Sequence, residues 1–143
     1  MHDGFGVEAH AVGDIQVLAV RGELNGESRV PLQEAVLAGL ARGPVVVDLS
    51  SATFLGVSVL RSLVQCHDTA IERRRPLVLA AAPSSVVRML SVAHAHDHLP
   101  LTRSVVAGLD AVRRLDALWN KTADAGTRVT DPQRGMGSPV PEL

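Results

Sequence analysis

Two short apolar runs limit the folds that this chain can adopt: VVVDL at residues 45–49 and LVLAAA at residues 77–82. Neither run alternates polar and apolar residues, so each predicts a strand that is covered on both faces of a sheet. A helical pattern follows each run, over residues 57–73 and from Pro83 onward. Strands that alternate with helices in this way predict parallel pairing with helical crossovers.

The rest of the chain extends this pattern at both ends. Two strands at its start, joined by a turn signal at Gly13 and Asp14, are followed by a helix that begins at Glu27 or Ser28. The remaining expected elements are strands at 7–12, 15–24 and 99–102, a loop at 50–54 and a last helix at 104–118. The order β-β-α-β-α-β-α-β-α predicts an α/β fold with a single mixed, mostly parallel β-sheet.

One domain is expected, over residues 7–119. Residues 120–143 hold Gly, Pro, Thr and charge without periodicity, so they are expected to form a disordered tail. Because aromatic residues make up only 2% of the 143 residues, the core must be built from Val, Leu, Ala and Ile.

Charge and hydropathy exclude several classes of protein. A formal net charge of −1 gives no electrostatic basis for direct binding to nucleic acid or to an anionic membrane. No apolar segment approaches the roughly 18–20 residues that membrane insertion of a helix needs, and the N-terminus shows no signal-peptide pattern. With Cys66 as the single cysteine, no intrachain disulfide can form, and a cytoplasmic location is expected.

Four segments together resemble the STAS domain, the module of bacterial anti-sigma factor antagonists: VRGELN, VVVDLSSATFLGVSVL, PLVLAAAPSSVVRML and SVVAGLDAV. The resemblance covers residues 7–118 and keeps the order of the elements. It implies a protein that binds an anti-sigma factor, a serine kinase-like ATPase, and so releases a sigma factor. It also implies that the chain is no enzyme and holds no cofactor; a monomer or weak homodimer is expected.

In that family the loop after the central strand usually continues with Asp-Ser-Ser-Gly, and the second serine accepts phosphate from the partner. The resemblance places Gly56, Val57, Ser58 and Val59 at these positions, so only the acceptor hydroxyl of Ser58 is kept. The family's Gly-Glu-Leu-Asp phrase likewise ends here in Asn25, so two acidic positions near the acceptor are neutral. The residues expected to bind the partner are Asn25, Thr53, Gly56, Val57, Ser58, Arg61, Ser62 and Gln65.

Elementary chemistry gives Ser58 two possible roles. The first turn of a helix presents unpaired N–H groups and a partial positive charge. A serine there can cap the helix or remain solvated, or it can accept a phosphate that the helix end stabilises. Arg61, three residues later, would lie on the same face and could pair with the phosphate. Val57 and Val59 make the start of the helix apolar, which suits a docking surface.

Other readings of the sequence remain. Alternatively, a chain with this fold could serve as an unphosphorylated STAS subunit of a stress-sensing or transport assembly. The HAHDH tract at residues 94–98 could hold a metal, but its spacing matches no closed site, so no metal is expected. Ser58 lies in no Gly-x-Ser-x-Gly elbow, which argues against a hydrolase. The ERRRP run at residues 72–76 is expected to be a solvated helix end, and Cys66 a packed thiol.

Overall fold

The computed structural model describes residues 4–93 and 99–129, and its elements follow the predicted order. The strands in these ranges are β1 (Gly6–Val12), β2 (Ile15–Leu24), β3 (Val45–Leu55), β4 (Leu77–Ala80) and β5 (Leu101–Thr102). The helices are α1 (Arg29–Arg42), α2 (Val57–Glu72), α3 (Ser84–Val92) and α4 (Val105–Val129). The predicted order of elements and the α/β fold class are therefore confirmed.

The strands form one mixed sheet in the order β1-β2-β3-β4-β5. β1 and β2 pair antiparallel across a tight turn, where Gly13 has a φ of 65° that glycine adopts at little cost. The pairs β2–β3, β3–β4 and β4–β5 are parallel. Parallel neighbours need long connections, which α1, α2 and α3 supply in turn.

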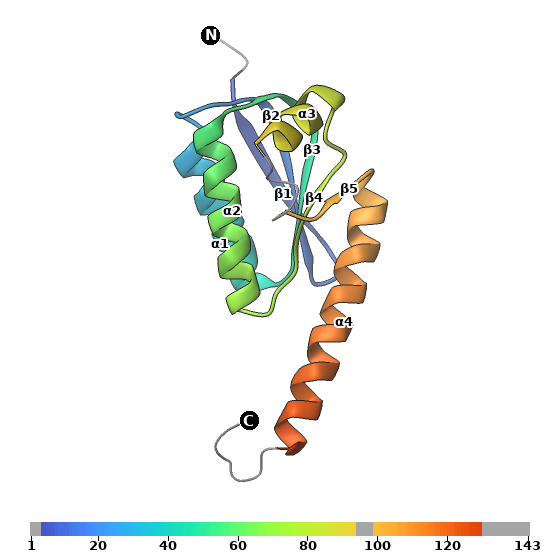
Figure 1. Ribbon diagram of the computed structural model, residues 1–143. Coiled ribbons are helices and arrows are strands. Elements are labelled where there is room, and N and C mark those ends of the chain that lie inside the picture. The colour runs from blue at the N-terminus through green and yellow to red at the C-terminus, as the bar shows by residue number, and fades with distance from the viewer. Residues whose placement is uncertain (1–3, 94–98, 130–143) are drawn as a thin grey trace.

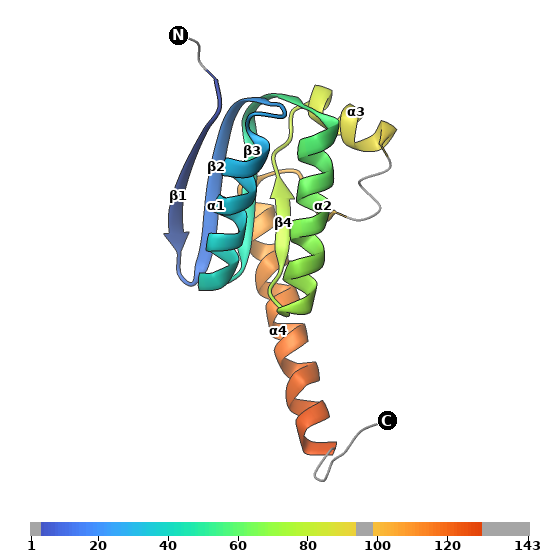
Figure 2. The ribbon, with the colours of Figure 1, turned by 90° about the vertical axis from the view of Figure 1, so that its left-hand side faces the viewer.

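Helices cover both faces of the sheet, as Figures 1 and 2 show. Val45 and Val47 of β3 belong to the larger core cluster, which also contains buried residues of α1 and α2. Val46 belongs to the second cluster, where the sheet packs against α4. Because successive strand residues point to opposite faces, the unbroken valine run fills both cores at once.

β3 is longer than the sequence predicts. Residues 50–54, expected to be a loop, continue the strand to Leu55. The second half of β3 pairs with the end of β2, so that Ser51 lies opposite Arg21 and Leu55 opposite Leu24, with register shifts between the two halves. Backbone pairing of polar residues at the end of a sheet leaves no apolar pattern, so this extension of β3 could not be predicted from periodicity.

The last helix also differs from expectation. α4 continues to Val129, so Asn120, where the disordered tail was expected to begin, lies inside a helix. Residues 130–143, the rest of the expected tail, lie outside the described residues. Among the helices of residues 4–93 and 99–129, none is long and apolar enough to cross a membrane.

Candidate functional site

The residues expected to bind a partner gather where β2 and β3 end. The backbone N–H of Gly56, directly after β3, donates to the carbonyl of Leu24, the last residue of β2, over 2.8 Å. This bond brings the turn between β2 and α1 beside the start of α2. Two segments that are about thirty residues apart in the chain therefore form one end of the molecule, the upper end in Figure 1.

Ser58 is exposed on the first turn of α2. Gly56 is the N-cap residue, with extended backbone, and no side chain caps this helix. The capping role considered for Ser58 is therefore wrong, and the alternative of an exposed residue in the first turn holds. A Cβ built on Gly26 would lie 4.0 Å from the Ser58 Oγ, so the hydroxyl faces the turn between β2 and α1.

The first turn of α2 suits an added anion. It contains no acidic residue. The backbone N–H groups at the start of the helix receive no capping hydrogen bond from a side chain. Such amides, together with the helix dipole, favour negative charge. Arg61 is exposed one turn later, on the same side of the helix as Ser58, as the sequence predicts.

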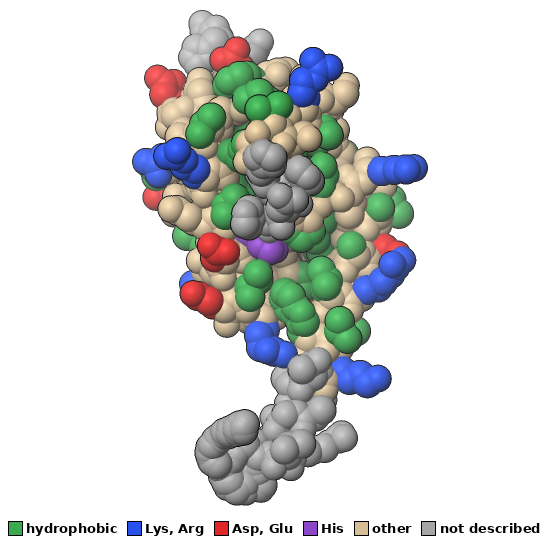
Figure 3. Space-filling model, in the orientation of Figure 1, with side chains coloured by type: hydrophobic (Ala, Val, Ile, Leu, Met, Phe, Trp, Pro, Cys, Tyr) green, Lys and Arg blue, Asp and Glu red, His purple; other side chains and the backbone are tan. Residues whose placement is uncertain are grey.

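Two exposed apolar side chains lie beside Gly56, at the junction of β3 and α2. Val57 is 55% exposed and Phe54, near the end of β3, is 45% exposed. The Phe54 ring lies beside Gly56, because a Cβ built there would be 3.5 Å from its Cε2 atom. Phe54 was not among the predicted site residues, since its exposure follows from the unexpected extension of β3. Figure 3 shows hydrophobic surface at this end of the molecule.

Val59 and Ser62 do not belong to this surface. Val59 is fully buried, so the expectation that it makes the helix start apolar toward a partner is wrong. Ser62 is only 4% exposed, and its hydroxyl donates to Oε1 of Gln33 on α1 over 3.0 Å. The assignment of Ser62 to partner binding is therefore wrong, because its one polar atom is already used inside the domain. Gln65, by contrast, is exposed.

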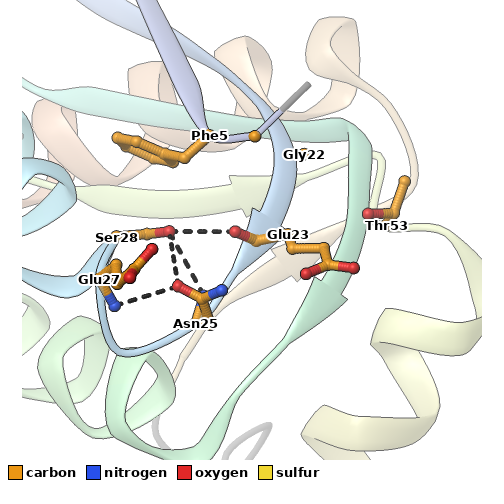
Figure 4. Close-up of a pocket in the computed structure, with 8 residues that line it drawn as sticks. Phe5, Gly22, Glu23, Asn25, Glu27, Ser28 and Thr53 are labelled. Carbon is orange, nitrogen blue, oxygen red and sulfur yellow. Dashed lines mark hydrogen bonds between the residues drawn. The ribbon is translucent and has the colours of Figure 1, made fainter. Parts of the chain in front are cut away.

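The turn between β2 and α1 is fixed by its own side chains. Asn25 accepts a hydrogen bond at Oδ1 from the backbone N–H of Glu27, over 3.0 Å. The buried hydroxyl of Ser28 donates to the carbonyl of Glu23 over 3.0 Å and lies 3.4 Å from the same Asn25 oxygen (Figure 4). Ser28 occupies the N-cap position but makes no capping bond. Asn25 is half-buried, and its carbonyl oxygen holds this turn in shape.

A hollow of about 720 Å³ opens beside this turn. Figure 4 shows Phe5 on one side and Thr53 on the other, with Glu23, Glu27 and Asn25 between them. Two carboxylates and a ring face suit a cationic group better than a phosphate. The predicted residues thus divide between two places, with Asn25 and Thr53 at the hollow and Gly56 to Gln65 along α2.

Two other candidates from the sequence were a metal-binding tract and a basic run at a helix end. The HAHDH tract lies outside the described residues, and within residues 4–93 and 99–129 no three His, Cys, Asp or Glu side chains are grouped to hold a metal. In the basic run, Arg74 donates to the carbonyl of Trp119 on α4, and Arg75 to the carbonyl of Leu40 on α1. These two arginines therefore join the segment after α2 to α4 and α1, so the expected solvated helix end is only part of their role.

Cys66 is buried in the core on α2, as expected for a packed thiol. Removal of the thiolate from water raises its pKa from 9.0 to about 11. The thiol therefore stays protonated near neutral pH and is a poor nucleophile.

Comparison with known proteins gives one family and several similar structures. The family described as "Mlab, STAS domain" matches residues 8–103. No curated protein matches the chain. An anti-sigma factor antagonist from Mycobacterium paratuberculosis is 24% identical with a TM-score of 0.70, and the match covers 78% of this chain and 96% of that one.

Two more structures share the fold at lower identity. A variant of RsbS from Moorella thermoacetica is 23% identical with a TM-score of 0.62, over 76% of this chain and 96% of that one. The anti-sigma factor antagonist SpoIIAA in its unphosphorylated form is 14% identical with a TM-score of 0.60, again over 76% and 96%. At these identities the likeness establishes the fold alone.

Proposed function

The chain belongs to the STAS domain family, and from this premise we propose that it acts by binding, as an anti-sigma factor antagonist. In this proposal it captures an anti-sigma factor of the serine kinase-like ATPase type and so releases a sigma factor. The ATP and the catalytic groups would belong to the partner. Two of the similar structures described above are themselves anti-sigma factor antagonists, which supports the role without establishing it for this chain.

The observation that carries the proposal is the position of Ser58. Its hydroxyl is exposed on an uncapped helix start, so a kinase can reach it and the helix end can stabilise the product. The nearby Gly26 leaves room for added atoms, since even a Cβ there would be 4.0 Å away. Phosphorylation of Ser58 is therefore proposed as the step that regulates binding.

The surface proposed to dock the partner is here named the β3–α2 surface and consists of Phe54, Val57, Ser58, Arg61 and Gln65. Its two exposed apolar side chains would be buried by the partner and supply the gain in free energy. A phosphate at Ser58 adds about −1.5 to −2 charges beside them. Dehydration of this charge inside an apolar interface is costly, so phosphorylation would release the partner.

The test is affinity capture from the native cell lysate, with mass spectrometry of both the partner and the bait. Wild type, Ser58→Ala and Ser58→Glu would be compared, because Ala keeps the surface uncharged and Glu imitates the phosphate. We expect an anti-sigma factor to be captured by wild type and by Ser58→Ala, and at least tenfold less by Ser58→Glu. Recovery of no anti-sigma factor by any of the three would contradict the proposed function.

A second candidate function is a permanent, unphosphorylated subunit of a stress-sensing or transport assembly. The observation in its favour is the neutral and apolar character of the surface, with Asn25, Gly56 and exposed Val57 where the family has two acids and a serine. It predicts that Ser58→Glu changes capture only slightly, that the bait carries no phosphate, and that the captured proteins are subunits of such an assembly.

A further inference from the structure

The outer edge of β1 is the longest stretch of unpaired backbone in the sheet. β1 has seven residues and pairs only with β2, so within the described residues its other side is open (Figures 1 and 2). The opposite edge strand, β5, has two residues. Edge strands of natural proteins are usually protected by lysine, proline, a bulge or a covering element. β1 reads GVEAHAV and contains neither lysine nor proline.

The register of β1 shows which backbone groups face outward. The N–H of Gln16 on β2 donates to Pro44, on the β3 side, so the backbone of Ile15 faces β1. Ile15 lies opposite Val12. Since inward and outward positions alternate along a strand, the backbone groups of Val7, Ala9 and Ala11 face away from the sheet.

We propose that this edge pairs antiparallel with the same edge of a second copy of the chain, about a two-fold axis at Ala9. In that register Ala9 lies opposite Ala9 of the second copy, and Val7 opposite Ala11 of the second copy. All outward N–H and C=O groups of Val7, Ala9 and Ala11 then find partners. A two-fold axis makes each contact occur twice, so the surface needs to be complementary only to itself.

Charge selects this register over its neighbours. With the axis at Ala9, Glu8 of each copy lies opposite His10 of the other copy, and an imidazole N–H can donate to the carboxylate. An axis at Glu8 would instead place two carboxylates opposite each other, and an axis at His10 two imidazoles, at fewer backbone bonds in either case. Opposite like charges destabilise a strand pair, whereas complementary ones stabilise it.

The surroundings of these side chains are compatible with pairing. Glu8 and His10 point to the α4 side of the sheet, because their neighbour Val12 packs in the cluster beneath α4. On that side Glu8 shares a hollow of about 220 Å³ with Arg21 and Asp48. On the α1 side, Ala9 and Ala11 are exposed and small, so they present no obstacle to a second sheet.

The two edges of the sheet differ in a way that limits assembly to a dimer. Pairing through β1 uses the longer of the two sheet edges found in residues 4–93 and 99–129, and the two residues of β5 are too few to continue the array. A ten-stranded sheet of two copies would therefore close, rather than grow into a fibre.

The test is sedimentation equilibrium of the full chain over a range of concentrations. We expect a reversible monomer–dimer equilibrium for the wild type. Ala9→Pro removes the outward N–H at the centre of the interface while leaving the ladder with β2 intact, so it should be monomeric. His10→Glu places two carboxylates opposite each other twice, so its dimer should dissociate about tenfold more readily.

The matched control is the exchange Glu8→His with His10→Glu, which restores both complementary pairs and should return the dissociation constant to within about threefold of the wild type. If circular dichroism shows that Ala9→Pro fails to fold, the dissociation constants of His10→Glu and of this exchange variant test the proposed register without it. A wild type that stays monomeric at its highest soluble concentration overturns the proposal. So does a dimer that His10→Glu leaves unchanged. Neither readout involves the anti-sigma factor, so the outcome is independent of the proposed function.

Discussion

Replacement of Ser62 by alanine removes a hydrogen bond that joins α2 to α1. Ser62 is 4% exposed, and its hydroxyl lies 3.0 Å from Oε1 of Gln33. A neutral hydrogen bond of this kind contributes about 0.5–1.5 kcal/mol to the free energy of unfolding. Because Gln33 is half-buried and can partly rehydrate, we expect Ser62→Ala to cost about 1 kcal/mol, or roughly 3–6 °C in Tm for a domain of this size.

The measurement is a double-mutant cycle in urea, followed by circular dichroism, with Ser62→Ala, Gln33→Ala and the double variant. If the two side chains act through one bond, the second change costs less once the first has been made, with a coupling free energy of about 1 kcal/mol. Exposed Arg61 provides the control, since Arg61→Ala should alter stability by less than about 0.5 kcal/mol. Strictly additive losses would refute the stabilising hydrogen bond between Ser62 and Gln33.

Two further outcomes follow from backbone strain and from burial. Gly22 has a φ of 92°, and a Cβ there would collide with the carbonyl of Gly4, so Gly22→Ala should lose about 1–3 kcal/mol of unfolding free energy. Gly13 also has a positive φ but lies in open space, so Gly13→Ala should lose less. Equal losses in the two variants would contradict the collision at Gly22. The pKa of Cys66 is about 11 in the folded chain and near 9.0 in the unfolded chain. Between pH 9 and pH 11 the unfolded chain therefore binds fewer protons than the folded chain. The free energy of unfolding should fall by up to roughly 2–3 kcal/mol as the pH rises through this range. Cys66→Ala should remove that part of the pH dependence, and a variant with the wild-type slope would count against it.

The order of elements could be predicted because it depends on local patterns. The two apolar runs and the turn at Gly13 place the strands, and the helices between them follow from spacing alone. The parallel pairing then follows from chain connectivity. Ser58, Arg61 and Gln65 were correctly placed on the exposed side of α2 by their positions along the helix.

The remaining features depend on residues that are distant in the chain. Ser62 looks like a surface residue until Gln33, 29 residues earlier, is brought beside it. Val59 is buried because α2 is covered by both the sheet and α1, which widens its buried side beyond what an apolar stripe indicates. The exposure of Phe54 depends on pairing between β3 and the end of β2, and no periodicity in SSATF indicates that pairing.

The extension of β3 has a consequence for the entropy of binding. A flexible loop at residues 50–54 would lose conformational freedom when a partner docks, at a cost on the order of 1–2 kcal/mol for each residue. Here these residues are already held in a strand, and Gly56 is tied to Leu24, so most of that loss occurs during folding. The backbone of the β3–α2 surface is therefore held in place by the fold, so docking of a partner there would cost little conformational entropy of the main chain.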